Sequence, residues 1–159
     1  MRNGSDGTSP GWKPPSWAGT SPVVLTIGTF DVLHFGQIAF LRKCSLLGSH
    51  LVVGVNSDRF TGSYKRRPVM SQDERMYALA ALGFDVTLND GPGRDLIFEK
   101  KPGILAIGSD WARKDYYKQI DVTQDELDVA EICLAYVPYV SAGMPMSTSE
   151  IIRRIKENS

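Results

Sequence analysis

The segment Gly28–Gln37 brings together residue types that can bind a phosphate group. Gly28 follows a short apolar run, where a residue without a side chain lets the backbone turn tightly and approach a ligand. His34 and Gln37 are spaced to share one face at the start of a helix, with Gly36 leaving room for an anion between them. The free N–H groups and the dipole of a helix start favour negative charge. This spacing predicts a phosphate cradle, although a histidine bonded to a nearby carbonyl explains His34 equally well.

Basic residues further along the chain could neutralise the phosphates of the same ligand. Lys65, Arg66 and Arg67 are consecutive, and Arg75 follows within the next expected helix. The run is either a solvated basic turn, which is what most such runs are, or a phosphate-binding loop. Its position just before a capped helix favours the second interpretation.

Two later segments also carry groups that can bind a nucleotide. Asp110 and Trp111 follow a short apolar run, where they are either a turn acid and a core aromatic or contacts to a nucleoside. Ser147, Thr148 and Ser149 stand at the start of the last expected helix. One of these hydroxyls caps the helix, while its neighbours and the free N–H groups can face a phosphate.

The elements that must position these residues alternate along the chain. The expected strands are at 23–27, 51–55, 84–88, 104–107 and 133–137, and the expected helices are at 37–47, 71–81, 94–99, 123–130 and 147–156. Three helices begin with a capping-box pattern, at Ser71, Thr123 and Ser147. The alternation predicts an α/β fold: a single Rossmann-like domain whose five-stranded parallel sheet has helices on both faces. Ligands bind such sheets beyond the carboxyl ends of the strands, where Gly28–Gln37 begins.

Composition limits the classes of function. The chain has 159 residues, enough for one domain, and a formal net charge of zero, which argues against a nucleic-acid partner. No run is apolar enough to span a membrane, and the N-terminus has no apolar signal core, so we expect a cytoplasmic protein. Cys44 and Cys133 lie among apolar residues without metal-site spacing, which predicts buried free thiols.

Residues 1–21 differ from the rest of the chain because they are rich in glycine, proline and serine. Such a composition predicts a flexible tail that precedes a domain at 22–159. Trp12 and Trp17 interrupt this tail, and an arm that docks on a neighbouring subunit is the alternative interpretation.

Five segments, in order, resemble the cytidylyltransferase-like nucleotidyltransferases of the HxGH type, and most closely the glycerol-3-phosphate cytidylyltransferases. The resemblance covers most of residues 23–157. The matching segments are Gly28-Thr29-Phe30-Asp31-x-x-His34-x-Gly36, Leu51–Asp58, Lys65–Pro68 with Arg75, Ile107–Trp111 and Ser147–Ser149 before Ile151.

This resemblance implies transfer of a nucleoside monophosphate, CMP from CTP, to a small phosphorylated alcohol or sugar, with release of pyrophosphate. It implies a Mg²⁺ ion carried by the triphosphate, no metal site of the protein's own, and pairing as a homodimer. The implied catalytic residues are His34, Gln37, Lys65, Arg66 and Arg75. The implied nucleotide-binding residues are Gly28, Thr29, Phe30, Asp31, Gly36, Asp110, Trp111, Ser147, Thr148 and Ser149.

The chain departs from this family at two places. Gln37 stands where the motif normally has a histidine, and glutamine can donate a hydrogen bond but cannot carry a proton or positive charge. The loop 139–146 is longer than the family's and lacks its arginine. Two alternatives therefore stay open. One is an adenylyltransferase that acts on a sugar phosphate, which the pattern of Asn56–Asp58, Lys65 and Arg67-Pro68 also resembles. The other is a nucleotide-binding or scaffolding homologue with weakened catalysis.

Overall fold

The computed structural model describes residues 13–139 and 146–159, and a five-stranded parallel sheet forms its centre. The sheet has the order β3-β2-β1-β4-β5. Each strand lies within one residue of its expected ends. The strands are β1 (Val23–Gly28), β2 (His50–Asn56), β3 (Asp85–Asn89), β4 (Ile104–Gly108) and β5 (Cys133–Val137).

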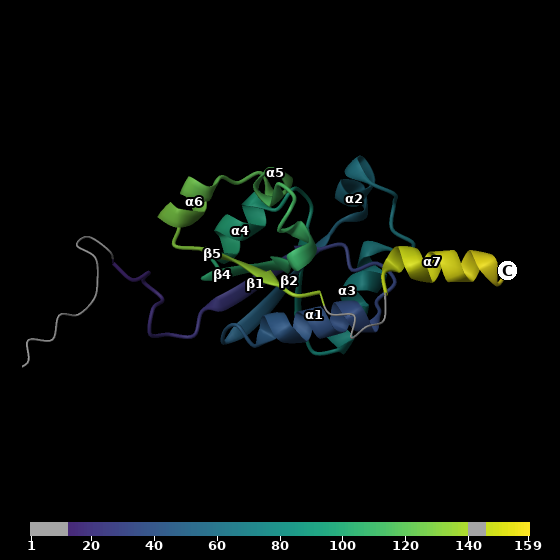
Figure 1. Cartoon of the computed structure of the whole chain (residues 1–159), viewed down its shortest axis with the longest axis horizontal. Helices are drawn as coiled ribbons and strands as arrows, with labels where there is room; N and C mark the ends of the chain where they lie inside the picture. The colour runs from purple at the N-terminus through teal and green to yellow at the C-terminus, as the bar shows by residue number, and fades with distance from the viewer. Residues whose placement is uncertain (1–12, 140–145) are drawn as a thin grey trace, which may run out of the picture.

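Helices cover both faces of this sheet (Figure 1), which confirms the predicted α/β fold. The five expected helices are α1 (Phe35–Ser45), α3 (Gln72–Ala81), α4 (Arg94–Lys100), α6 (Gln124–Val129) and α7 (Thr148–Glu157). Two helices and a 3₁₀ turn were not expected from the sequence. They are α2 (Asp58–Tyr64), α5 (Tyr116–Ile120) and the turn η1 (Ser109–Trp111).

Alternating strand residues build two separate hydrophobic layers. Val24 of β1 packs in the layer that includes residues of α1 and α3, and its neighbour Leu25 packs in the layer that includes residues of α4, α5 and α6. In Figure 1, α1 and α3 accordingly lie on one side of the sheet and α4, α5 and α6 on the other. Because successive side chains of a strand point to opposite faces, apolar runs without polar alternation are what a sheet covered on both faces requires.

Strand order reverses between β1 and β4, which are neighbours in the sheet although β2 and β3 separate them in sequence. The chain moves outward from β1 to β3, and then crosses to β4 on the other side of β1. The connections that leave the carboxyl ends of β1 and β4 diverge to opposite faces, which opens a crevice at this end of the sheet.

Helix caps mostly follow the expected pattern. Ser71 and Thr123 form complete capping boxes at the starts of α3 and α6. Ser147 accepts a hydrogen bond from the N–H group of Glu150, but the Glu150 carboxylate pairs with arginines of α7 instead of closing a box. The last helix therefore has only half of the expected motif.

The described part of the predicted tail includes Trp17, and Trp12 lies outside the described residues. The Trp17 indole Nε1 donates a hydrogen bond to the main-chain oxygen of Glu131 over 2.7 Å. At Trp17 the chain therefore packs on its own domain, whereas the composition of residues 1–21 predicted a flexible tail.

Both cysteines are free, but only Cys44 is buried. Cys133 is exposed because it stands at the start of the edge strand β5, so the expectation of two buried thiols was wrong for this residue. Within residues 13–139 and 146–159, no helix has the length and apolar character that crossing a bilayer requires.

Candidate active site

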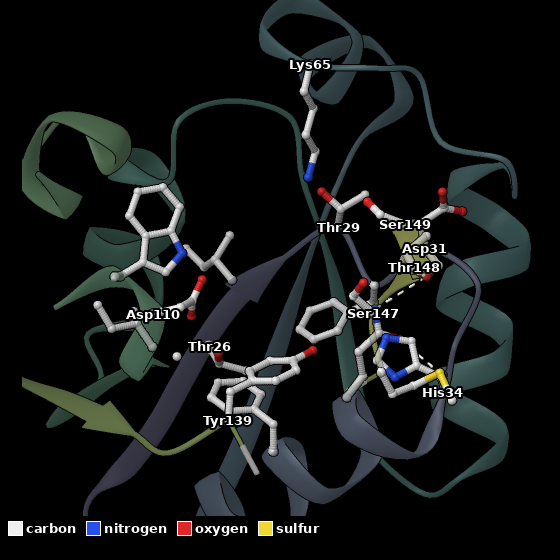
Figure 2. A pocket seen from close by; sticks show the side chains of 18 of the residues that line it. Thr26, Thr29, Asp31, His34, Lys65, Asp110, Tyr139, Ser147, Thr148 and Ser149 are labelled. Carbon is white, nitrogen blue, oxygen red and sulfur yellow. Dashed lines mark hydrogen bonds between the residues drawn. The ribbon is translucent and has the colours of Figure 1, made fainter. Parts of the chain in front are cut away.

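A cleft of about 730 Å³ lies at the carboxyl ends of β1 and β4, where the strand order reverses. Figure 2 shows that side chains from the β1–α1 segment, the end of α2, the turn after β4 and the start of α7 converge on it. The expected site residues that line it are Thr29, Phe30, Asp31, His34, Gln37, Lys65, Arg66, Asp110, Trp111, Ser147, Thr148 and Ser149.

His34 and Gln37 together cap the start of α1. His34 Nδ1 accepts a hydrogen bond from the N–H group of Gly36 over 3.2 Å, and Gln37 Oε1 accepts one from the N–H group of His34 over 3.3 Å. Burial lowers the pKa of His34, which favours the neutral imidazole. Since Nδ1 accepts, the proton of the neutral ring is on Nε2, which leaves that nitrogen as a donor.

Asp31 links the β1–α1 segment to the basic loop. Its buried carboxylate accepts hydrogen bonds from the N–H groups of Val69 and Met70 over 2.9 and 3.0 Å, and pairs with Arg66 over 3.3 Å. The residues on either side, Phe30 and Val32, have left-handed φ angles of 53° and 48°. This backbone conformation is costly for large side chains, so the contacts of Asp31 must hold it in place.

Lys65 supplies a cation at the cleft. It caps the end of α2, and Figure 2 shows its side chain extending toward Thr29. Burial lowers the pKa of Lys65, and the nearby Asp31 carboxylate partly offsets this effect. Lys65 is exposed to solvent overall, and its ammonium group can pair with an anion that enters the cleft.

The first turn of α7 places three hydroxyl-bearing residues at the cleft, Ser147, Thr148 and Ser149. Ser147 Oγ caps the helix by accepting from the Glu150 N–H group over 3.1 Å. Thr148 Oγ1 donates to the main-chain oxygen of Asp31 over 2.7 Å. Figure 2 shows the three side chains near Asp31 and His34, so the start of α7 lies beside the start of α1 at the same end of the cleft.

Asp110 and Trp111 lie in the 3₁₀ turn η1 that follows β4, on the other side of the cleft. Trp111 packs edge-to-face against Tyr116 of α5, with ring centroids 5.4 Å apart. Asp110 is more than half exposed and pairs loosely with Lys114 over 3.7 Å. The cleft thus has a cationic, hydroxyl-rich end and an aromatic end, which matches the two ends of a nucleotide.

Arg75 does not line the cleft. Its side chain is fully buried and donates hydrogen bonds to Asp58 Oδ1 over 2.7 Å and to the main-chain oxygens of Met70 and Thr29. These partners occupy the guanidinium group. The structure therefore places Arg75 beneath the site, where it holds three loops together, instead of against a phosphate as the sequence suggested.

Gly28 and Gly36 also lie outside the cleft lining, and each leaves room for a ring that does line it. A Cβ atom at Gly28 would lie 3.0 Å from the Phe30 ring. A Cβ atom at Gly36 would lie 3.1 Å from the His34 ring. The absence of a side chain at Gly28 and Gly36 therefore lets the Phe30 and His34 rings pack closely against the backbone.

Sequence reasoning missed four polar or aromatic residues of the lining, which are Thr26, Phe40, Tyr116 and Tyr139. Thr26, Phe40 and Tyr116 are inside or next to apolar patterns that are typical of core positions. Tyr139 could have been found from its place just after the fifth strand, because the carboxyl ends of parallel strands share one edge. The rest of its loop, residues 140–145, lies outside the described part of the chain.

Comparison with known proteins shows a family match over most of the chain. Residues 25–154 match the model of the cytidylyltransferase-like family. The chain is 37% identical over 147 residues to the bifunctional protein HldE of Campylobacter concisus, covering 89% of this chain and 29% of that protein. It is 36% identical over 143 residues to the protein of the same name from Aeromonas salmonicida, covering 85% and 28%. The chain thus spans less than a third of the length of these curated relatives.

Solved structures show a similar fold. A lipopolysaccharide core biosynthesis protein from Thermoplasma volcanium is similar with a TM-score of 0.60 and 26% identity, over 74% of this chain and 95% of that one. A pantoate-beta-alanine ligase from Francisella tularensis is similar in fold alone, with a TM-score of 0.51 and 18% identity over 86% and 70%. The chain belongs to the cytidylyltransferase-like family, the family of nucleotidyltransferases that its five motif segments resemble.

Proposed function

We propose that this protein transfers a nucleoside monophosphate from a nucleoside triphosphate to a phosphorylated sugar, with ATP as the donor. The observation that carries the proposal is the convergence of His34, Lys65 and the first turn of α7 on one cleft. The similarity to a lipopolysaccharide core biosynthesis protein supports a sugar acceptor. The resemblance of Asn56–Asp58 and Lys65 to adenylyltransferase domains supports ATP over CTP.

The proposed reaction is a displacement at the α-phosphorus. A phosphate oxygen of the acceptor forms a bond to this phosphorus, the α–β anhydride bond breaks, and pyrophosphate leaves with the electron pair. No nucleophile from the protein is required. Catalysis then depends on holding the two phosphates in line and on stabilising the charge that develops on the phosphoryl oxygens.

Different residues of the cleft bind and stabilise different parts of the two substrates in this proposal. His34 donates from Nε2 to a phosphoryl oxygen, because its Nδ1 is occupied as the acceptor of the helix cap. Lys65 and Arg66 offset the negative charge of the phosphates. Ser149 and the N–H groups at the start of α7 face the triphosphate, as helix starts do for anions.

Magnesium fits this site as part of the nucleotide. Among the described residues, no group of three or more His, Cys, Asp or Glu side chains could hold a metal ion. The Asp31 carboxylate is occupied by main-chain N–H groups and Arg66. Mg²⁺ is commonly held by substrate phosphates and water, and it would neutralise triphosphate charge there.

Pyrophosphate release tests the proposal. The protein is incubated with Mg²⁺, with each nucleoside triphosphate in turn, and with a panel of phosphorylated sugars and alcohols. ATP with a sugar phosphate should release pyrophosphate fastest. Faster release with CTP and a phosphorylated alcohol would instead support the cytidylyltransferase expectation.

A second candidate function is nucleotide binding without efficient transfer, which Gln37 favours because the amide cannot carry a charge. Calorimetric titration with ATP and CTP distinguishes it: tight binding without pyrophosphate release from any acceptor supports this candidate. The predicted homodimer is tested separately by light scattering.

A further inference from the structure

Tyr139 occupies the floor of the cleft, at a position that none of the motif segments includes. The residue follows β5 by two positions, and its ring stacks on Phe40 with centroids 5.4 Å apart and planes 25° apart. The residue lines the cleft and is 39% exposed. Phe40 belongs to the buried core of α1, so the stack fixes the ring against a rigid element.

Two glycines lie against the Tyr139 ring. A Cβ atom at Gly108 would be 3.3 Å from Tyr139 Cδ2, so one edge of the ring rests on the end of β4. A Cβ atom at Gly36 would be 3.6 Å from Tyr139 Cε1 and 3.1 Å from His34 Nδ1. Because Cε1 adjoins the carbon that carries the hydroxyl, the polar end of the ring lies beside Gly36 and His34.

The close-up view agrees with these distances. In Figure 2, Tyr139 extends across the middle of the cleft between Asp110 and His34, and its hydroxyl is directed toward the side where His34 and Ser147 lie. Asp110 belongs to the aromatic end of the cleft, and His34 and Ser147 belong to its hydroxyl-rich, cationic end. The ring thus spans both ends, and its hydroxyl reaches the phosphate end.

The chemistry of this hydroxyl suits an anion. Burial raises the pKa of Tyr139 to about 12, and the negative charge of Asp110 adds to this effect. The phenol therefore stays protonated at neutral pH and can donate a hydrogen bond. A neutral, rigidly held donor in a partly desolvated cleft stabilises charge that develops on a phosphoryl oxygen.

We propose that Tyr139 is a further catalytic residue, whose hydroxyl donates a hydrogen bond to the phosphoryl group that His34 also contacts. This inference rests on the proposed function, since it assigns a group to the same phosphate site. It differs from the motif assignments because Tyr139 comes from the segment after β5, which none of the motif segments includes.

The variant Tyr139→Phe removes the hydroxyl and keeps the stack on Phe40. We expect kcat/KM for the triphosphate to fall on the order of a hundredfold, as when one donor to a developing oxyanion is removed. The unfolding midpoint should stay that of the wild type. Tyr136→Phe is the matched control, because Tyr136 is an exposed tyrosine of β5 that does not line the cleft. It should leave both quantities unchanged.

Equilibrium binding provides a readout that a structural role would not change. Tyr139→Phe should weaken binding of ATP but not of adenosine, which has no phosphate. Wild-type affinity for ATP together with wild-type kcat/KM in the variant would overturn the inference and leave the proposed function intact. Equal weakening toward adenosine and ATP would also overturn it, because the hydroxyl would then act on the nucleoside.

Failure of the proposed function has a separate signature. In that case the wild type releases no pyrophosphate with any donor and acceptor. The ATP and adenosine titrations still decide whether the Tyr139 hydroxyl contacts a phosphate.

Discussion

Thr148 donates a hydrogen bond from Oγ1 to the main-chain oxygen of Asp31 over 2.7 Å, although 117 positions separate the two residues in the chain. The bond joins the first turn of α7 to the segment that leads into α1. No residue of α7, Thr148–Glu157, is buried, and Figure 1 shows the helix extending away from the rest of the domain. Polar contacts at its start therefore matter more than packing for holding the hydroxyls of this turn at the cleft.

Thr148→Val should weaken substrate binding because it removes this bond at nearly constant volume. A single hydrogen bond of this kind contributes about 1 kcal/mol, which corresponds to roughly a fivefold rise in KM for the triphosphate. Steady-state kinetics measure the change, and Thr148→Ser, which keeps a hydroxyl, is the control. An unchanged KM in the valine variant would show that other contacts position the start of α7.

His34→Ala should abolish transfer and weaken nucleotide binding, since it removes the Nε2 donor from the cleft. It also removes the cap of α1, at a cost of about 1 kcal/mol of stability. His34→Asn separates the two effects, because asparagine is a good helix cap but has no imidazole Nε2 to donate to a phosphate. The asparagine variant should keep the wild-type unfolding midpoint and still lose turnover. Wild-type turnover in either well-folded variant would contradict the assigned site.

The stability of the protein should depend on the protonation of His34. Because burial lowers its pKa below the ordinary value of 6.5, the unfolded chain takes up the proton before the folded one does as pH falls. The free energy of unfolding should therefore decrease as pH falls from about 6.5 toward the pKa of the folded state. Urea titrations between pH 7.5 and 5, at roughly half-unit steps, measure this, and the decrease should be smaller in His34→Asn.

Gln37→His should raise turnover if the missing charge limits the chemistry. Gln37 is buried and lines the cleft, and its amide hydrogen bonds within the described part of the chain are long, 3.3 Å to His34 and 3.4 Å to Asp31. Replacing it should therefore disturb the cap of α1 little. A gain on the order of a hundredfold in kcat is expected by analogy with adding an oxyanion donor. Unchanged or lower turnover would show that the missing charge at position 37 does not limit the rate.

Arg75→Met should destabilise the fold, because it leaves Asp58 and the main-chain oxygens of Thr29 and Met70 without their donor. Breaking one partner of a buried ion pair costs about 3–5 kcal/mol, and the partial exposure of Asp58 favours the lower end. Urea unfolding measures the loss. Arg59→Met is the control, since the pair of Arg59 with Asp90 is exposed and should contribute far less. Equal losses in the two variants would contradict the structural role of Arg75.

Much of the fold could be predicted because its signals are local. The strand ends were expected within one residue, since apolar runs such as 23–27 stop at a glycine or a turn residue. The capping boxes at Ser71 and Thr123 mark helix starts within four residues of sequence. The helices α2 and α5 have seven and five residues and were missed, because neither begins with a capping box of the kind that marks the start of the six-residue α6 at Thr123.

The sequence by itself determined the order of strands and helices, the caps, the motif residues around His34 and hence the family. Only the tertiary structure decided what those residues touch. Arg75 points into the protein, Tyr139 reaches across to Gly36, and Thr148 bonds Asp31. These contacts form because β2, β1, β4 and β5 lie side by side in one parallel sheet, so the segments that leave their carboxyl ends meet at one edge. Periodicity and capping act over a few residues, whereas these contacts depend on strand order, which no local pattern encodes.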